Sequence, residues 1–482
     1  MDAQTEREAG SQPGSAAGPV KPAVDEATRF QIVRAELGRL APWGPVTAEA
    51  LATLETHFRT RLAAVVAARA AVPPGAGAAR GERDTPPTRA APQTTRPEGG
   101  PALLAAARAL LPRIRAAAEE IERERRLPVA LVRALADAGL FRMSLPPSLG
   151  GPAIDPLARF EVIEAVATAD AATAWCLEIG SSVAWMVGGW LREDVARAIL
   201  CRHPYDLVCG AVAVPRGHAR PVPGGYRLTG RWPWGSGCTH SAWIAGAGVV
   251  AHDGASPGPT GAPVVRVFVV PASEVEIIDT WTSIGLRGSG SHDYAVRDVF
   301  VPEERTFSLL SDPPAQSGPL FAFRGLYLSA AAGLALGVGR AAIEALVELA
   351  AVKVPNRATT LLRERGPVQA QVAQAEALVG SARAFACEVL ADLWRTLRAG
   401  DEPSARQRAR YRLAITHAMQ AATQAVDLMY GAAGGSAVYT SCPLERQFRD
   451  IHTLAQHASL APTTLEPAGR LLLGLEPGAP FF

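Results

Sequence analysis

Apolar residues recur at helical spacing over the stretch that follows residue 100. They lie three or four residues apart, as on one face of an α-helix, at Leu103, Leu104, Ala107, Leu110, Leu111, Ile114, Ala117 and Ile121. Pro128 can open a second helix, and Gly139 can end it in a left-handed conformation. The stretch 157–200 continues in this manner through Trp175 and Trp185. Residues 101–206 therefore predict an N-terminal α-helical domain.

The pattern changes near residue 207. Short β-branched or alternating runs such as "LVCGAVAV", "GYRLTG", "AWIAGAGVV", "VVRVFVV" and "YAVRDVFV" are separated by Gly, Pro and Asp turns. Runs of this kind are typical of antiparallel strands. The sequence predicts a middle β-domain over 207–312, folded as a small barrel or sandwich.

Helical periodicity returns after the "SDPPAQSGP" break. Three long amphipathic helices are predicted, followed by a shorter one after Pro443, and together they predict a C-terminal four-helix bundle over 313–482. Strands that stand between runs of helices, without βαβ alternation, indicate an α+β fold rather than a Rossmann-type sheet.

The first hundred residues have a different character. Residues 1–100 form an extension, with a possible helical pair over 30–72 and a Pro/Gly-rich linker over 73–100. The polar, aperiodic start does not read as a signal peptide, and no later segment offers about 20 uninterrupted apolar residues. We therefore expect a cytoplasmic protein that does not span a membrane.

Charge and cysteine content narrow the class of ligand. The chain has 48 Lys and Arg against 46 Asp and Glu, so no overall field attracts nucleic acid or an anionic membrane. Six cysteines are scattered without a C-x-x-C pair, which disfavours a disulfide framework or a structural zinc site. A small-molecule substrate or a protein partner is favoured.

Residues 230–243, "GRWPWGSGCTHSAW", bring tryptophans and glycines together with Cys238 and His240. The Cys-x-His pair suggests metal or thiol chemistry, whereas tryptophans between glycines suggest a flat ligand close to the backbone. No second pair with ligand spacing occurs, and no G-x-S-x-G elbow marks a nucleophile. We predict no metal site, and Cys238 reads as a small half-buried residue.

The order of several motifs adds a family resemblance. "GLFRMSLPPSLGG" (139–151), "GGYRLTGRWPWGSGCTHSAW" (224–243), "GLRGSGSHDYAVRDVFVPEER" (285–305), "GLALGVGRAAIE" (333–344) and "ERQFRDIHTLAQH" (445–457) follow one another as in the acyl-CoA dehydrogenase superfamily. The resemblance covers about 101–475. It implies the acyl-CoA dehydrogenase-like fold and a homotetramer built through the C-terminal bundle.

Within that superfamily, the acid–base residues point to one branch. A dehydrogenase needs a carboxylate to remove the substrate's α-proton. "RDIHTLAQHASLAP" has none after Asp450, and "FAFRGLYLSAAAGLAL" has none either. The pattern R-D-x-H-T-x-x-x-H, supplied by Arg449, Asp450, His452, Thr453 and His457, instead resembles the flavin-dependent monooxygenases, which include two-component hydroxylases, dibenzothiophene monooxygenase and amino-sugar N-oxygenases.

The resemblance implies a mechanism and partners. Reduced FMN, or FAD, would come from a separate NAD(P)H-dependent flavin reductase and react with O₂ to a C4a-hydroperoxide, which hydroxylates or N-oxygenates a small organic substrate. Two alternatives remain open: an acyl-CoA dehydrogenase-type desaturase with an unusual base, and a flavin-binding scaffold without catalysis.

The resemblance also assigns roles to residues near the ring. His457 is the candidate acid or base, because a histidine with a pKa near 6.5 transfers protons at neutral pH. His452 would orient the motif or a neighbouring subunit. Ser236 would donate toward flavin N5, with Gly237 allowing close backbone approach. Tryptophans such as Trp234 and Trp243 would wall the ring. Each assignment has a plainer structural alternative: a core histidine, a turn serine, or core packing of the tryptophans, because strand alternation gives Trp232 and Trp234 the same face.

Two further cofactor contacts are implied. Arg287, Gly288 and Ser289 offer a loop for the flavin phosphate or ribityl chain, although a Gly-rich turn with a surface arginine would look the same. Arg357 would reach the cofactor of an adjacent subunit.

Overall fold

The computed structural model describes residues 99–251 and 264–479. The chain divides into two units, residues 1–92 and 93–482, and only the second contains described residues. The predicted helical pair over 30–72 lies outside the described residues, as does the linker up to residue 98.

The N-terminal part of the described unit is helical, as predicted. Its helices are α3 (Gly100–Glu124), α4 (Val129–Asp137), α5 (Pro156–Ala167), α6 (Ala171–Trp190) and α7 (Glu193–Leu200). Asp155 and Asp170 cap α5 and α6, because each carboxylate accepts hydrogen bonds from the free backbone N–H groups of the first turn. Helix α6 is buried along almost its whole length, so it forms the centre of this region.

The middle part is a mixed sheet. In the described residues its strands are β1 (Val208–Ala211), β2 (Gly217–Val222), β3 (Gly225–Gly235), β4 (Trp243–Val250), β5 (Val265–Pro271), β6 (Glu276–Ile278), β7 (His292–Pro302) and β8 (Thr306–Phe307). Their order is β6-β7-β3-β2-β4-β5-β8, and β1 pairs with β4.

The expectation of antiparallel strands throughout was wrong at two places. Strands β1 and β2 both pair with β4 in parallel, whereas β2–β3, β3–β7, β4–β5, β5–β8 and β6–β7 are antiparallel. The alternation of polar and apolar residues shows which face of a strand is buried, but it does not determine the direction of the neighbouring strand. The turn after β3 is not a hairpin, and it returns the chain alongside β2.

Trp232 fills the interior of the sheet. Its side chain is 1% exposed, it stacks on Tyr294, and its Nε1 donates to the carbonyl of Ala247 at 2.7 Å. A Cβ added at Gly217 or Gly246 would lie within 2.7 Å of its ring. The glycines of this region therefore make room for one indole.

The C-terminal part contains α8 (Ala331–Val352), α9 (Gly366–Ala399), α10 (Ala405–Ala433), α11 (Pro443–Leu454) and α12 (Leu465–Leu472). The three long helices and the shorter one after Pro443 are those predicted, and α12 is additional. Within the described part of the chain, one segment, 324–352, is apolar and long enough to span a membrane, but 78% of its apolar window is buried. Most of this segment is therefore packed in the core of the described unit.

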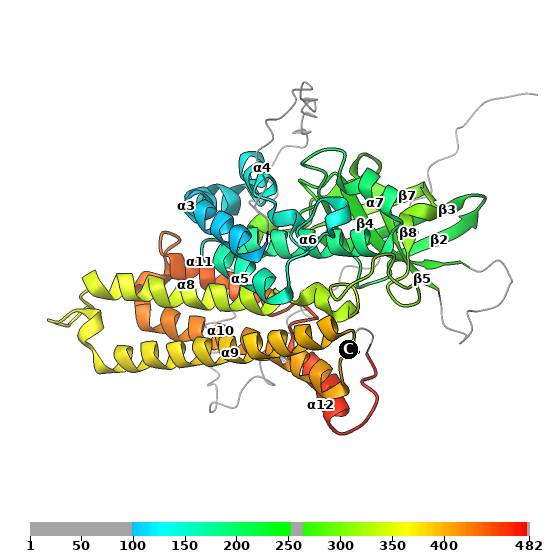
Figure 1. The fold of residues 1–482 in the computed structure, drawn as a ribbon. Helices are drawn as coiled ribbons and strands as arrows, with labels where there is room; N and C mark the ends of the chain where they lie inside the picture. The colour runs from blue at the N-terminus through cyan, green and yellow to red at the C-terminus, as the bar shows by residue number, and fades with distance from the viewer. Residues whose placement is uncertain (1–98, 252–263, 480–482) are drawn as a thin grey trace, which may run out of the picture. The chain divides into compact units, whose positions relative to one another are not determined.

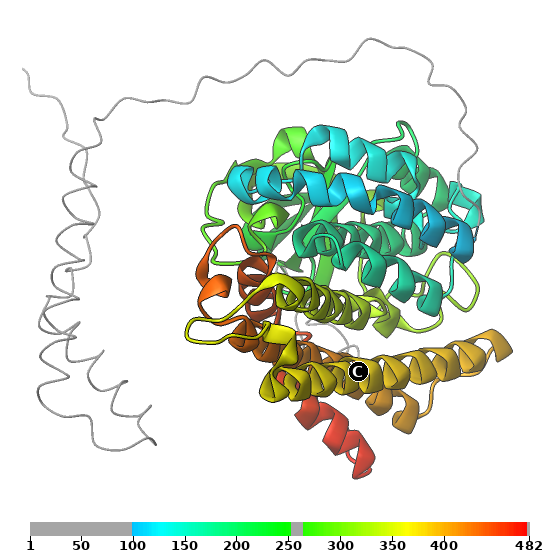
Figure 2. The same cartoon turned by 90° about the vertical axis from the view of Figure 1, so that its left-hand side faces the viewer.

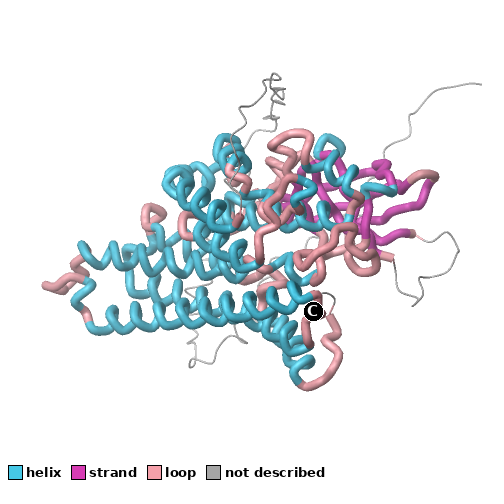
Figure 3. Tube along the Cα trace, viewed as in Figure 1, coloured by secondary structure: helices cyan, strands magenta, loops and turns pink. Residues whose placement is uncertain are grey.

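The layers meet at α6. Figure 1 shows α8, α9 and α10 running side by side, and Figure 2 gives the view turned by 90°. In Figure 3 the strands gather at one end of the described unit, away from the long helices. Helix α6 contacts β1 as well as α8 and α11. The turn after β3 and the end of α11 are thereby brought to the same buried helix.

Candidate active site

The turn that follows β3, residues 234–241, is called the serine turn here. A register irregularity between Trp232 and Gly235 interrupts the pairing of β3 with β7. Trp234 has a φ of 63°, and its side chain is 60% exposed, whereas Trp232 is buried. The expectation that the two tryptophans share one face was therefore wrong, because the bulge turns Trp234 outward.

Trp175, Ser236 and His457 come together from three parts of the chain. The indole Nε1 of Trp175, on α6, donates to the Ser236 hydroxyl at 2.9 Å. The His457 ring meets the Trp175 ring edge-on, with the ring centroids 5.1 Å apart and the planes at 68°. The Trp175 and Ser236 side chains are buried. The structure thus joins two of the predicted catalytic residues through a tryptophan.

His457 lies beyond its helix. Helix α11 ends at Leu454, and His457 follows in a turn where its Nδ1 accepts the backbone N–H of Ser459 at 3.3 Å. Burial, together with the positive charge of Arg412, lowers the pKa of His457 to about 4. The expectation of a pKa near 6.5 was wrong. At neutral pH the ring is uncharged, and because Nδ1 accepts, the proton is assigned to Nε2.

His452 does not join this group. It lies on α11, where its Nε2 contacts an Asp427 carboxylate oxygen at 2.8 Å and its ring packs on Phe448 with centroids 4.5 Å apart. The partner Asp427 belongs to α10, so His452 links α11 to the bundle. The two histidines of the motif thus have separate environments.

A chain of hydroxyl groups continues from Ser236 into the segment that precedes β7. Its Oγ lies 2.8 Å from that of Ser291, which lies 2.7 Å from that of Ser289. Ser289 donates to the Leu286 carbonyl at 2.7 Å. All three serines are at most 5% exposed. Gly237, with a φ of 80°, donates its N–H to the Ser289 carbonyl and fastens the serine turn to this chain.

Cys238 and His240 complete the serine turn. Burial raises the pKa of Cys238 to about 12, so its thiol stays protonated, and its Sγ donates to the Gly290 carbonyl at 3.5 Å. Burial lowers the pKa of His240 to about 4, and its Nδ1 has no hydrogen-bond partner among the described residues. Among the described residues no group of three or more His, Cys, Asp or Glu is arranged to hold a metal.

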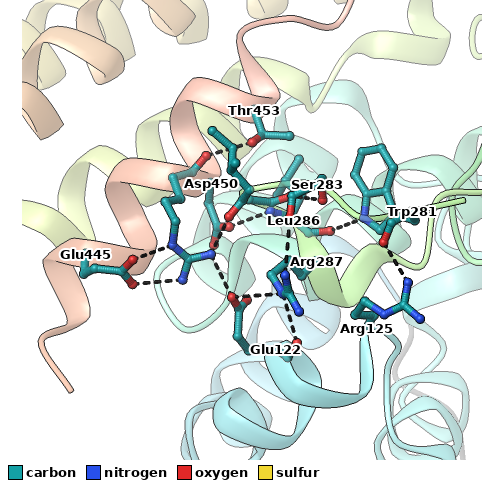
Figure 4. Close-up of polar contacts among 12 residues, drawn as sticks. Glu122, Arg125, Trp281, Ser283, Leu286, Arg287, Glu445, Asp450 and Thr453 are labelled. Atoms are coloured by element: carbon teal, nitrogen blue, oxygen red, sulfur yellow. Dashed lines mark hydrogen bonds and ion pairs between the residues drawn. The ribbon is translucent and has the colours of Figure 1, made fainter. Parts of the chain in front are cut away.

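Residues 285–290, called the arginine loop here, are packed against α3. Arg287 Nε lies 3.3 Å from a Glu122 carboxylate oxygen and donates to the Glu122 carbonyl (Figure 4). A Cβ at Gly288 would lie 2.0 Å from Ile121 Cγ2. Arg287 is thus paired with Glu122, and Ile121 occupies the space beside Gly288. A flavin phosphate would have to compete with Glu122 for the Arg287 guanidinium.

The Arg-Asp pair of the C-terminal motif holds this loop. Arg449 contacts Glu122 at 2.7 Å and Glu445 at 2.6 Å, and Asp450 accepts the Leu286 N–H at 2.6 Å (Figure 4). Burial raises the pKa of Asp450 to about 7, and the nearby Asp170 carboxylate adds to the rise. The motif therefore fixes the arginine loop to α11 and α3.

Two predicted cofactor residues lie apart from the serine turn. Trp243 is half-buried at the start of β4, with the Arg305 guanidinium 5.4 Å from its ring centroid. Arg357 is exposed between α8 and α9, with a φ of 62°. Among the described residues, no hydrogen bond or ring contact brings either of them to Ser236.

Sequence reasoning missed Trp175 as a site residue, because it reads as one apolar residue in an apolar helix. It also missed a buried ion pair one turn further along α6. Arg159 Nη2 lies 2.8 Å from a Glu178 carboxylate oxygen, and burial raises the pKa of Glu178 to about 7. No spacing in the sequence links these two residues, which only the packing of α5 on α6 brings together.

The serine turn fits a flavin on two observations. Trp234 presents an exposed indole beside Ser236, whose N–H bonds the Trp234 carbonyl at 2.9 Å. A large exposed aromatic side chain suits a planar ligand. In the same turn, the Nδ1 atom of His240 has no hydrogen-bond partner among the described residues, so it can form a hydrogen bond with a ligand.

Comparison with known proteins identifies the family of the chain. The family model "Acyl-CoA dehydrogenase, N-terminal domain" matches residues 102–201, and "Acyl-CoA dehydrogenase, C-terminal domain" matches residues 329–462. The chain is 30% identical over 367 residues to an indole-3-acetate monooxygenase of Pseudomonas putida, which covers 76% of this chain and 92% of the relative. It is 30% identical over 387 residues to the flavin-dependent monooxygenase oxygenase subunit HsaA of Mycobacterium tuberculosis, covering 78% and 96%.

Solved structures show the same fold. The HsaA monooxygenase of M. tuberculosis superposes with a TM-score of 0.71 at 29% identity, covering 80% of this chain and all of that one. XiaF from Streptomyces sp., solved with FADH2 and glycerol, superposes with a TM-score of 0.72 at 26% identity, covering 79% and 97%. The protein is a reduced-flavin-dependent oxygenase component that acts on a small substrate, and such a component implies a separate flavin reductase. The chain belongs to the acyl-CoA dehydrogenase superfamily, in its branch of flavin-dependent monooxygenase oxygenase components.

Proposed function

We propose that this monooxygenase hydroxylates a small aromatic compound at the face formed by Trp175, Ser236 and His457. The observation that carries the proposal is the convergence of these three side chains from α6, the serine turn and the end of α11. The aromatic class follows the printed names of two relatives, an indole-3-acetate monooxygenase and a resorcinol hydroxylase.

A bound reduced flavin supplies two electrons to O₂, so that one oxygen atom enters the substrate and the other leaves as water. Trp234 would offer its exposed ring as a wall for the flavin, and Ser236 would face the edge of the flavin ring. His457 is neutral at pH 7, because burial holds its pKa near 4. Its Nε2–H therefore donates a hydrogen bond to an oxygen atom or a substrate hydroxyl, rather than releasing a proton as an imidazolium.

The wider assembly is part of the proposal. FMN or FAD would be reduced by a separate NAD(P)H-dependent enzyme in the cytoplasm. The protein would form a homotetramer through its C-terminal helices, with Arg357 reaching the cofactor of a neighbour. The exposed position of Arg357 leaves its side chain available for such a contact.

Isotope labelling tests the function. The protein is supplied with FMN or FAD, a flavin reductase and NAD(P)H, then given ¹⁸O₂ and a panel of phenols and indoles that includes indole-3-acetate. We expect one ¹⁸O atom in a hydroxylated product. Hydrogen peroxide as the sole oxygen product, with every aromatic compound left intact, would contradict the proposal and favour a scaffold without catalysis.

A further inference from the structure

The hydroxyl chain that starts at Ser236 has a fixed end. The Leu286 carbonyl can only accept hydrogen bonds, so Ser289 must donate its single hydroxyl proton there. The carbonyl cannot easily turn away, because the Leu286 N–H is bound to Asp450 and the carbonyl also accepts from Trp281 Nε1 at 3.0 Å (Figure 4).

This end determines the direction of every other bond in the chain. Since the proton of Ser289 is committed, Ser291 must donate to Ser289 across 2.7 Å. Since the proton of Ser291 is then committed, Ser236 must donate to Ser291 across 2.8 Å. At the other end, Trp175 has only an N–H to offer, so Ser236 accepts from it.

Ser236 is left with one lone pair and no free proton. A ligand atom that meets this hydroxyl must therefore be a donor, or the whole chain must reverse. The N5 atom of a flavin carries a hydrogen when the flavin is reduced and only a lone pair when it is oxidised. The two redox forms thus make opposite demands on Ser236.

We propose that Ser289 and Ser291 are positioning residues that make Ser236 a hydrogen-bond acceptor, so that the site binds reduced flavin in preference to oxidised flavin. This inference rests on the proposed function, which puts the flavin edge against Ser236. The chain would retain the flavin that arrives reduced and release it once it is oxidised. The donor role first expected for Ser236 would require the chain to reverse.

Binding of the two redox forms tests the inference. The dissociation constants of oxidised and dithionite-reduced FMN and FAD are measured without oxygen for the wild type, Ser291→Ala and Ser289→Ala. Ser291→Ala frees the Ser236 proton directly, because its acceptor is lost. Ser289→Ala frees it indirectly, because Ser291 can then donate to Ser236. We expect the ratio of the dissociation constant of oxidised flavin to that of reduced flavin to fall about five- to tenfold. The reason is that Ser236 can then donate a hydrogen bond to the N5 atom of oxidised flavin. The potential of the bound flavin should fall by about 20–30 mV.

A matched control lies in the neighbouring loop. Ser283 donates to the Gly285 carbonyl at 2.7 Å outside the chain, so Ser283→Ala should leave the ratio unchanged. Equal weakening of both redox forms in Ser291→Ala and Ser289→Ala would show a merely structural role and overturn the inference.

A flavin-free readout separates this inference from the proposed function. The ¹⁵N–¹H resonance of the Trp175 indole, assigned by its loss in Trp175→Phe, should shift in Ser291→Ala, because the hydroxyl that accepts it loses its own acceptor. An unshifted resonance would contradict the proposed hydrogen-bond chain, whereas the ¹⁸O experiment on the proposed function would be unaffected. Absence of ¹⁸O incorporation with a shifted resonance and a changed binding ratio would instead contradict only the oxygenase reaction and leave the chain supported.

Discussion

The serine turn and the arginine loop have similar compositions but use their residues differently. Both are rich in glycine and serine, and both contact α6. In the arginine loop the charge of Arg287 is paired with Glu122 and the space at Gly288 is filled by Ile121. In the serine turn the Trp234 ring is exposed and a buried histidine nitrogen has no partner among the described residues. An exposed ring and a hydrogen-bonding atom without a partner, rather than composition, distinguish a surface that can bind a ligand from a packed loop.

The largest expected effect separates the two histidines of the motif. His457→Ala should lower the rate of product formation about 100-fold or more, because the Nε2–H donor beside Trp175 is lost. His452→Ala is the matched control and should stay within about threefold, since His452 contacts Asp427 in the bundle. Product and peroxide are measured per O₂ consumed. A larger loss in His452→Ala would place the chemistry elsewhere.

Flavin affinity compares the two loops directly. Trp234→Ala should weaken the binding of reduced FMN about tenfold, since stacking on an aromatic ring contributes about 1–3 kcal/mol. Arg287→Gln should change it less than about twofold, because the guanidinium is already paired. Anaerobic titration gives both constants. If the order is reversed, the arginine loop holds the flavin phosphate.

Stability should show the opposite preference. Gly288→Ala should lower the free energy of unfolding by about 1–3 kcal/mol, because the new Cβ would overlap Ile121. Gly380→Ala, in the exposed middle of α9 with nothing within 4 Å of its Cβ, should raise it by about 0.5–1 kcal/mol. Denaturant melts compare the two. If Gly288→Ala leaves the free energy of unfolding unchanged, the arginine loop has room for a ligand.

The smallest expected effect is on pH dependence. His457 and His240 have pKa values lowered to about 4 by burial, so their stabilising contribution is present above about pH 6.5 and is lost as the pH falls toward 4. The pKa of Asp450 is raised to about 7, so its contribution is present at low pH and is lost as the pH rises through 7. Asp450 affects stability, whereas the coupling of oxygen use to product depends on His457, which does not titrate between pH 6 and 8, so we expect the coupling to be flat over that range. A break near pH 6.5 that disappears in His457→Ala would show an ordinary histidine.

The sequence predicted the order of helices and strands because burial repeats with the period of each element. Strand direction could not be predicted, since β2 and β4 keep the same alternation whether they run parallel or antiparallel. The outward turn of Trp234 also escaped prediction, because the register irregularity between Trp232 and Gly235 shifts the alternation.

The candidate site was predicted only in part. Ser236 and His457 followed from motifs, but the contact between them depends on Trp175, which no motif marked. The uncharged state of His457 depends on burial and on Arg412, a residue of α10. Contacts between distant segments set these properties, and local sequence patterns carry no record of them.

A crystal structure of the protein with FMN tests the central claim most directly. We predict that the isoalloxazine ring lies against Trp234, with its N5 edge at the Ser236 hydroxyl and His457 facing the same site. A ring held elsewhere, with Ser236 still covered by Trp175 and the flavin bound only through Arg287, would contradict the account.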